Sequence, residues 1–341
     1  MKSLVSLFVI LIALPLPPAS PYGDGFASGN ANDYIDGNVQ AKQVRIARLG
    51  GVNALVIADA NVRLKTVPVI SGTKYTLRFD GSFTGDVESI EDNPRFEVFT
   101  RPGRKSPVLP SREIRFLDAA GKATGRTLVF SMPFRGKRTY TDVFYTPPDA
   151  VALRLDIASG KGITWSVQNL TLVKTSDEGT ININPAFALG TMNYSGWQNI
   201  SAGGKIIKTN GKTVFDSKYG SRGTAFPLHT PGTYALSARG TGNGYNSCVI
   251  LEVFDTAGKK IMRSRIRRYG QPNYFVLPKN AVTGSLLVYS CLLEEARLVR
   301  VGDEKSIDRF SDGKTVTRPV ALTKSLHVKL QMDRASGRDN D

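Results

Sequence analysis

The sequence predicts an all-β protein in which two related β-sandwich domains follow an N-terminal signal peptide. Three observations indicate this. The first residues form a short apolar run, the rest of the chain shows no helical period, and four patterns of the first half return in the same order in the second. The length of 341 residues suits two domains, and 41% hydrophobic residues can build ordinary cores.

The N-terminus has the parts of an export signal. Lys2 supplies a positive charge, residues 4–14 are almost all apolar, and the small residues Ala19 and Ser20 offer a cleavage site. The apolar run is short for a bilayer span, which takes roughly 20 residues; an uncleaved anchor is the alternative. We therefore expect residues 1–20 to be a signal peptide and the mature protein to be secreted or held in the cell envelope, with no integral membrane segment.

Short strand-like runs separated by turns fill most of the remaining chain. Examples are residues 74–79, 143–145, 151–157 and 170–173, where apolar residues alternate with polar ones or form brief β-branched and aromatic runs. Glycine, proline and aspartate cluster between such runs, as turns require. Many short strands with this spacing are typical of a β-sandwich or barrel.

Internal repetition divides these strands into two copies. The similar pairs are 71–77 with 231–236, 116–122 with 253–259, 145–151 with 276–282, and 168–172 with 294–298. Chance could produce one such pair but hardly four in the same order. The repetition predicts that both copies have the same fold.

The repeats set the domain boundaries. We place the first sandwich at 26–176 and the second at 181–302. An insertion in the first copy, 84–112, is rich in proline and charge, and we expect it to be a surface loop. Residues 303–341 form a polar C-terminal tail, with a short strand or two around 316–330.

The second copy carries an ordered set of motifs. It opens with Asn184-Pro185-Ala186-Phe187, followed by Gly190 and Trp197, continues through Pro231-Gly232-Thr233-Tyr234, and closes on Glu294-Glu295-Ala296-Arg297-Leu298. This order resembles the galactose-binding-like jelly rolls, especially carbohydrate-binding modules of the family-four and family-nine type. Without the opening motif, the resemblance extends to roughly 41–176. It implies two divergent jelly-roll sandwiches that bind carbohydrate, with Phe187, Trp197 and Tyr234 as core residues.

Departures from the family's pattern bear on its structural calcium ion. The acidic residue that follows the opening Phe in the family is Ala188 here, and the closing acidic position is Gln168 in the first copy and Glu294 in the second. Because calcium takes several oxygen ligands, the departures argue against a calcium site. We expect no other metal and no cofactor.

The net charge is +16, from 45 Lys and Arg against 29 Asp and Glu. Residues 21–180 carry +4 and residues 181–302 carry +10, so most of the excess lies in the second copy. A basic exported protein meets anionic polysaccharides, cell surfaces and acidic lipids. Nucleic acid is not an expected partner in that compartment, although the charge alone would permit it.

One strand-like segment gathers the candidate ligand contacts Arg263, Arg265, Arg267 and Tyr269. Alternate residues of a strand share a face, so these four should line up. Arginine forks bind carboxylate or sulfate, and a tyrosine ring offers a flat face to a sugar. The alternative is a solvated face or an edge strand charged against aggregation, which charge runs more often are.

Two glycine-rich loops of the second copy add the candidates Tyr219, Arg222, Asn243 and Tyr245. Loops on a rigid sandwich commonly contact ligands. The alternative is turn chemistry, in which Gly and Asn supply positive φ. The glycines do not lie between a strand and a helix, so a phosphate cradle is rejected.

The two cysteines, Cys248 and Cys291, lie in apolar strand-like runs. Export permits a disulfide if those strands are neighbours. The alternative is a pair of buried free thiols that pack as small hydrophobes. Neither has a nearby histidine in the sequence, so neither is expected to be catalytic.

The sequence contains no recognisable enzyme motif. His229 and His327 share no motif with a serine or carboxylate, and the HExxH, GxSxG and Cys/His metal spacings are absent. Residues 112–115 faintly resemble a motif of sandwich lyases, whose Gln-x-His partner is missing. Glu294 and Glu295 are neighbours on a strand and should point to opposite faces, which prevents them from acting as a glycosidase pair.

These observations rank three functions. The first is a secreted, non-catalytic carbohydrate-binding protein whose second copy recognises a polysaccharide, an anionic one included. The second is a structural or adhesive protein of the cell surface or envelope, and the third is a polysaccharide lyase. The sequence assigns neither the ligand nor the oligomeric state.

Overall fold

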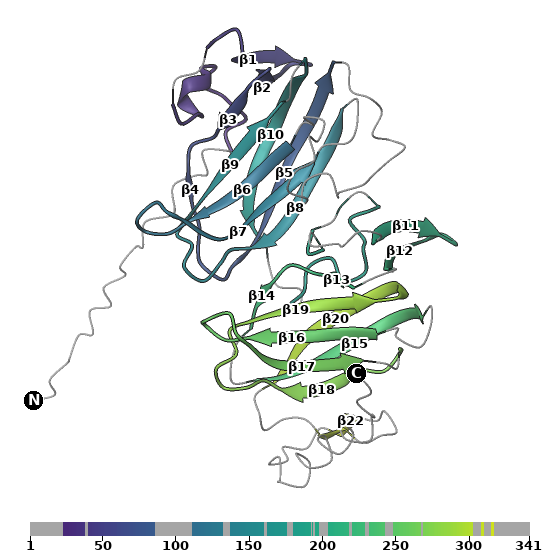
Figure 1. Ribbon diagram of the computed structural model, residues 1–341. Coiled ribbons are helices and arrows are strands. Elements are labelled where there is room, and N and C mark those ends of the chain that lie inside the picture. The colour runs from purple at the N-terminus through teal and green to yellow at the C-terminus, as the bar shows by residue number, and fades with distance from the viewer. Residues whose placement is uncertain are drawn as a thin grey trace, which may run out of the picture.

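The computed structural model shows an antiparallel all-β protein, as predicted (Figure 1). It describes residues 23–37, 40–85, 111–131, 137–159, 162–175, 180–191, 193, 195–197, 204–217, 220–228, 232–242, 248–266, 269–302, 308–309 and 315–316. One turn of 3-10 helix, η1 (Ala31–Asp33), precedes the first strand. The predicted signal peptide and most of the tail lie outside the described residues; within the tail, β21 (Asp308–Arg309) pairs with β22 (Thr315–Val316).

The first half of the chain forms two antiparallel sheets. One has the order β1 (Val44–Leu49), β2 (Val52–Ala58), β10 (Thr164–Lys174), β5 (Lys74–Thr84) and β8 (Arg138–Tyr145). The other has the order β3 (Asn61–Arg63), β9 (Ala152–Ala158), β6 (Ser111–Leu117) and β7 (Ala123–Ser131), with β4 (Val67–Pro68) also beside β9.

One hydrophobic cluster joins these two sheets. It includes Leu77 of β5 and Trp165 of β10 from the first sheet, and Ile114 of β6 and Leu155 of β9 from the second. Buried residues alternate with more exposed ones along β5, β6 and β9. This alternation arises because only one face of each sheet packs against the core.

The second half repeats this arrangement. One sheet has the order β11 (Lys205–Thr209), β12 (Lys212–Ser217), β20 (Cys291–Gly302), β15 (Thr233–Gly242) and β18 (Asn273–Val276). The other has the order β13 (Ser221–Arg222), β19 (Thr283–Tyr289), β16 (Cys248–Phe254) and β17 (Lys260–Ile266), with β14 (Phe226–Pro227) also beside β19. Each strand therefore occupies the sheet position of the strand numbered ten lower in the first half (Figure 1).

The most similar repeated segments form the same turn. Asp118 Oδ1 accepts hydrogen bonds from the backbone N–H groups two and four residues later, at 3.0 and 2.9 Å. Asp255 Oδ1 accepts from the matching groups at 3.0 and 2.9 Å. Gly121 and Gly258 have φ of 74° and 75°, a backbone conformation that residues other than glycine rarely adopt.

The opening motif occurs in both halves, although the sequence analysis found it only in the second. Phe26 and Phe187 both have positive φ, 62° and 55°, and are 1% and 0% exposed. The carbonyl of Phe26 accepts from the N–H of Gly29 at 3.2 Å, and that of Phe187 accepts from the N–H of Gly190 at 3.1 Å. The shared pattern is Phe-Ala-x-Gly, too short to stand out in the sequence.

The predicted insertion is shorter than expected at both ends. Strand β5 continues through Thr84, and β6 already begins at Ser111. Arg112, the last residue of the predicted loop, is buried inside the sandwich. Residues 86–110 lie outside the described part of the chain.

Candidate ligand-binding face

The outer face of the β13-β19-β16-β17 sheet carries the predicted arginines. Val249, Leu251 and Val253 of β16 belong to the interior cluster, so the residues between them lie on the outer face. In the register with β17, Arg265 is opposite Ile250 and Arg263 is opposite Glu252. Both arginines therefore lie on the outer face, as the sequence predicts for this pair.

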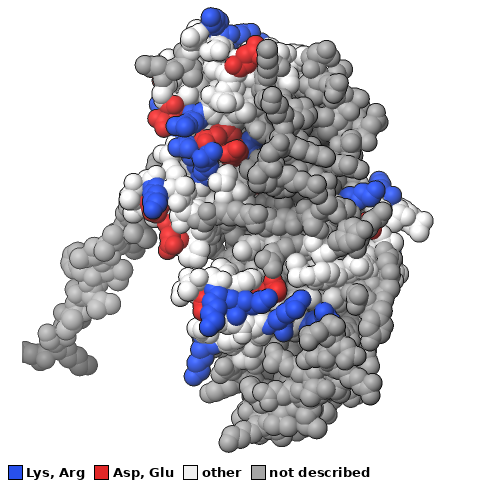
Figure 2. Space-filling view, viewed as in Figure 1, with Lys and Arg blue, Asp and Glu red and all other residues white. Residues whose placement is uncertain are grey.

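Lys260 joins the two arginines at this edge of the sheet. Its side chain is 48% exposed and that of Arg263 is 47% exposed, and Arg265 is also exposed. We call Lys260, Arg263 and Arg265 the basic face. Figure 2 shows positive side chains gathered over the second half of the chain in this view, with little negative charge beside them.

A single buried carboxylate balances part of this charge. Glu252 is 2% exposed, and its Oε1 lies 3.1 Å from Lys260 Nζ and 3.9 Å from Arg263 Nε. Arg265 has no ion-pair partner among the residues that the structure describes. Lys260 and Arg263 thus share one carboxylate while Arg265 contacts none in the described residues, which leaves guanidinium donors available for an anionic group from outside.

Tyr269 does not continue this row, contrary to the sequence prediction. Strand β17 ends at Ile266, and Tyr269 packs against the interior cluster of the second half. Burial of its hydroxyl raises the pKa of Tyr269 far above the usual tyrosine value. The prediction failed because it assumed a strand that continues three residues further, to Tyr269. Arg267 lies outside the described residues.

The predicted loop contacts can be placed only in part. Tyr219, Asn243 and Tyr245 lie outside the described residues. Arg222 belongs to β13, whose backbone pairs with β19 opposite Leu287, at the edge of the sheet away from β17. Its side chain is not described, so it remains a prediction.

The cysteines form no disulfide. Both are free and buried. Cys248 packs with Ile250 and Leu287 on the outer side of its sheet, whereas Cys291 lies in the interior cluster. Burial raises the pKa of the Cys291 thiol to about 11, which disfavours the reactive thiolate. The structure therefore has the two buried free thiols that the sequence offered as the alternative, because Cys248 faces away from the interior of the sandwich and Cys291 faces into it.

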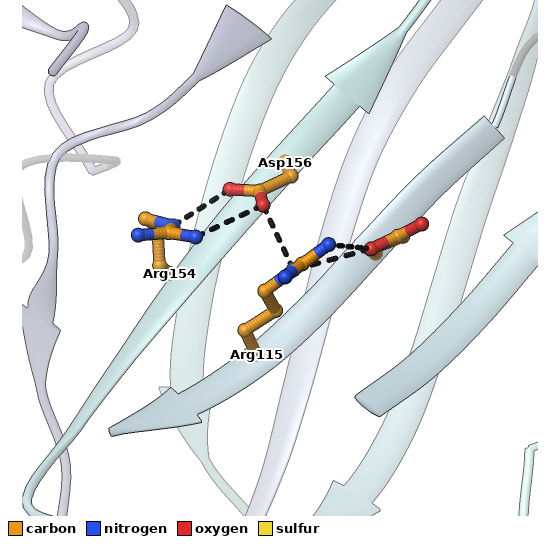
Figure 3. A network of polar contacts seen from close by, with 4 residues as sticks. Arg115, Arg154 and Asp156 are labelled. Atoms are coloured by element: carbon orange, nitrogen blue, oxygen red, sulfur yellow. Dashed lines mark hydrogen bonds and ion pairs between the residues drawn. The ribbon is translucent and has the colours of Figure 1, made fainter. Parts of the chain in front are cut away.

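The equivalent outer face of the first half is a balanced ion-pair network (Figure 3). Arg115 contacts Glu113 at 2.6 Å and Asp156 at 3.0 Å, and Arg154 contacts Asp156 at 2.8 Å. Two arginines thus meet two carboxylates at the centre of this face, and Arg63 of β3 lies exposed opposite Asp156 at its edge.

The faint lyase motif is divided between two sides of its strand. Arg115 is on the outer face, whereas Arg112 points inward and binds Asp142 with two hydrogen bonds, of 2.7 and 2.5 Å. Both side chains of this ion pair are 4% exposed. The Arg112 guanidinium also lies over the rings of Phe79 and Tyr140, at 5.1 and 5.3 Å.

Glu294 and Glu295 lie on the same side of their strand, contrary to the sequence prediction. A bulge in the pairing of β15 with β20 interrupts the alternation at this point. As a result Arg239 contacts both carboxylates, with its Nε 3.2 Å from Glu294 and its Nη2 3.4 Å from Glu295. Lys212 and Arg297 bind one carboxylate each, so cations surround the pair.

The residues considered for calcium have other partners. Gln168 Nε2 donates to the carbonyls of Leu49 and Val52 and so holds the β1–β2 turn. Among the described residues, no group of three or more His, Cys, Asp or Glu side chains could hold a metal ion. The same part of the chain contains no helix that is long and apolar enough to span a membrane.

Comparisons with known proteins assign no family to this chain. No known family profile and no curated protein matches the sequence. The enzymatically active domain of tailspike protein 4 from bacteriophage CBA120 is 16% identical over 46% of this chain and 22% of its own, with a TM-score of 0.32. A family 16 carbohydrate-binding module is 15% identical over 45% of this chain and 98% of its own, also at 0.32.

A third similar structure contains two modules in tandem. The N-terminal CBM22-1–CBM22-2 domain of Paenibacillus barcinonensis Xyn10C is 10% identical, covers 84% of this chain and 100% of its own, and has a TM-score of 0.34. Two of these three structures are carbohydrate-binding modules. Identities and TM-scores this low carry no argument about the ligand or activity of this chain.

Proposed function

We propose that this protein is a secreted, non-catalytic carbohydrate-binding protein whose second half binds an anionic polysaccharide through the basic face. The observation that carries the proposal is the set Lys260, Arg263 and Arg265 on one face of an edge strand, with one carboxylate between them. Arginine forks in this position suit carboxylate or sulfate groups along a glycan chain.

The proposal includes two tandem jelly-roll sandwiches, at 26–176 and 181–302. In the first half one sheet has the order β2-β10-β5-β8 and the other has the order β3-β9-β6-β7. The second half has the same two orders with each strand number raised by ten. This interleaved order supports a double-sheet jelly roll made of two Greek keys. The match of all ten strand positions between the halves supports a tandem duplication.

The non-catalytic part of the proposal rests on the sequence, which lacks an enzyme motif, and on two sets of side chains. Arg112 is held inside the sandwich by Asp142, and the Glu294–Glu295 pair is surrounded by cations. These ion pairs support the proposal, because each of these charged groups already has a partner of opposite charge.

Affinity electrophoresis and calorimetry on the mature protein test the proposal. The ligands are polygalacturonate, a sulfated galactan and neutral xylan, each at low and high salt. We expect binding to the two anionic polymers that weakens as salt screens the charges. The variant Arg263→Gln with Arg265→Gln should weaken binding about tenfold or more, because it removes charge-assisted hydrogen bonds.

The matched control is Arg45→Gln with Arg78→Gln, which removes the same charge from two exposed arginines of the first half. It should leave affinity within about twofold, since exposed charges at a distance are screened. Equal losses in both double variants, or no binding to either anionic polymer at low salt, would overturn the basic face as the site. New absorbance from unsaturated uronates would overturn the non-catalytic part.

A further inference from the structure

The edge of the first half is covered by a short segment of the second. Strand β8 is the last strand of its sheet, so one side of its backbone has no strand partner among the described residues. On that side the N–H of Val143 donates to Ser195 Oγ at 3.0 Å, and Asn193 Nδ2 donates to the carbonyl of Thr141 at 2.5 Å. Two side chains of the second half thus take the place of a neighbouring strand.

The covering segment is anchored in its own half. Asn193 Oδ1 accepts from the N–H of Ser195 at 2.9 Å, and the N–H of Asn193 donates to the carbonyl of Gly190 at 3.2 Å. Ser195 is 0% exposed, and Trp197, two residues later, belongs to the interior cluster. The segment is therefore held in shape by the second core and presents both side chains to β8.

A second contact lies at the end of the same strand. Tyr145 belongs to β8, yet its ring packs against the interior cluster of the second half. Its hydroxyl donates to the carbonyl of Ile181 at 2.7 Å. Lys74 lies over the Tyr145 ring at 5.7 Å, and its Nζ is 3.5 Å from the carbonyl of Thr180.

We call these contacts between the two halves the seam. The β8 residues that take part in it differ from their counterparts in β18 of the second half. When the pairing of β8 with β5 is compared with the pairing of β18 with β15, Tyr145 corresponds to Val276 and Val143 corresponds to Tyr274. Thus the second half has neither the hydroxyl nor the ring at the Tyr145 position. This difference in sequence is expected, because β8 contacts the second half of the chain.

From these contacts we infer that the two halves unfold as one cooperative unit. Domains joined in one chain ordinarily move relative to each other unless their interface is extensive and well packed. Here separation would expose the Tyr145 ring and strip the partners from the edge of β8 and from buried Ser195. The inference does not depend on the ligand.

The two tryptophans allow a test on the full chain, because Trp165 lies in the first half and Trp197 in the second. Trp165→Phe leaves a fluorescent reporter for the second half, and Trp197→Phe leaves one for the first. In each variant, urea unfolding is followed by tryptophan fluorescence and by far-UV circular dichroism, which reports the strands of both halves. Coincident curves from the two probes are the expected result.

Removing the seam should separate these curves. Two seam variants are made in both the Trp165→Phe and the Trp197→Phe protein: the double variant Asn193→Ala with Ser195→Ala, and the single variant Tyr145→Phe. Each should make the circular dichroism curve biphasic, and the fluorescence curve should follow one of the two phases. A separation of about 0.5–1 M urea is expected from the loss of two hydrogen bonds. Asn32→Ala is the control, since Asn32 follows Phe26 by six residues as Asn193 follows Phe187, but is exposed.

Two outcomes would overturn the inference. One is a fluorescence curve that departs from the circular dichroism curve while the seam is intact. The other is continued coincidence in both seam variants, which would show that these contacts do not couple the halves. The milder Tyr145→Phe variant keeps the test informative if the double variant fails to fold.

Discussion

The two halves share one strand order but fill the same position of their interiors differently. In the first half Arg112 and Asp142 form a buried ion pair. Counted from the shared turn at Asp118 and Asp255, the position of Arg112 is taken by Val249, which is buried in the interior cluster. The comparison teaches that this arrangement of strands does not require the ion pair.

The outer faces of the β3-β9-β6-β7 and β13-β19-β16-β17 sheets also differ in their charged residues. The first half has the paired charges of Glu113, Arg115, Arg154 and Asp156 there. The same positions in the second half hold Ile250, Glu252, Ser285 and Leu287, with the basic face along the edge strand. The central positions of this face are thus ionic in the first half and mostly uncharged in the second, where the cations lie on the edge strand.

A third difference reverses the charge at one strand position. Asp80 of β5 accepts hydrogen bonds from Thr139 and Asn169, whereas Arg239, at the matching position of β15, binds Glu294 and Glu295. In each half the charged side chain at this position binds partners on neighbouring strands. The strand order therefore sets where the partners lie, while the charge itself is free to change.

The largest expected effect tests the buried ion pair. Asp142→Ala leaves the Arg112 guanidinium buried without its carboxylate, and should lower the free energy of unfolding by about 3–5 kcal/mol. Urea unfolding followed by Trp165 fluorescence, in the Trp197→Phe background, measures it. The double variant Arg112→Val with Asp142→Asn introduces the residues of the second half and should recover most of the loss.

The control for this prediction is Asn273→Ala, at the matching position of β18, which is exposed. It should change stability by no more than about 0.5 kcal/mol. A double variant as unstable as Asp142→Ala would show that the first core needs the ion pair for its shape.

An intermediate effect tests how alike the repeated turns are. Gly121→Ala and Gly258→Ala each place a side chain at a φ near 75°, with no atom within 4 Å of the added carbon. The cost is therefore backbone strain alone, about 1–2 kcal/mol in each half. Urea unfolding of both variants should give losses equal within about 0.5 kcal/mol; unequal losses would break the equivalence of the turns.

The smallest effect tests the reversed charge through its pH dependence. Hydrogen bonds from Thr139 and then Asn169 lower the pKa of Asp80 below the usual aspartate value. A carboxylate whose folded pKa is lowered stabilises the protein above its unfolded pKa, and this contribution is lost as the pH falls through the folded value. The effect should be small because Asp80 is largely solvated.

Urea midpoints of Asp80→Asn and the unchanged protein, measured from pH 7 to pH 2, check this prediction. The difference between them should shrink as the pH falls below the usual aspartate range. A difference that stays constant over that range would show that the ionised form of Asp80 contributes nothing. Ser82→Ala, two residues along β5, serves as the pH-independent control.

Much of the fold could be predicted, and less of the candidate site. The alternation of apolar and polar residues in 74–79 and the turn at Asp118 could be predicted, because each depends only on residues that are neighbours in sequence. The bulge that brings Glu294 beside Glu295, and the end of β17 before Tyr269, were not, because both depend on how distant strands pair. Arg263 and Arg265 were placed correctly since both lie within one regular strand.

The sequence by itself determined that this chain forms antiparallel strands with repeated turns. Short-range alternation and left-handed glycines leave little choice of local structure. Only the tertiary structure decided that Arg112 turns inward to Asp142, that Cys248 faces away from the interior of the sandwich while Cys291 faces into it, and that Tyr145 enters the other half's core. These outcomes depend on which segments meet across the fold, and that is set by packing between residues far apart in the chain.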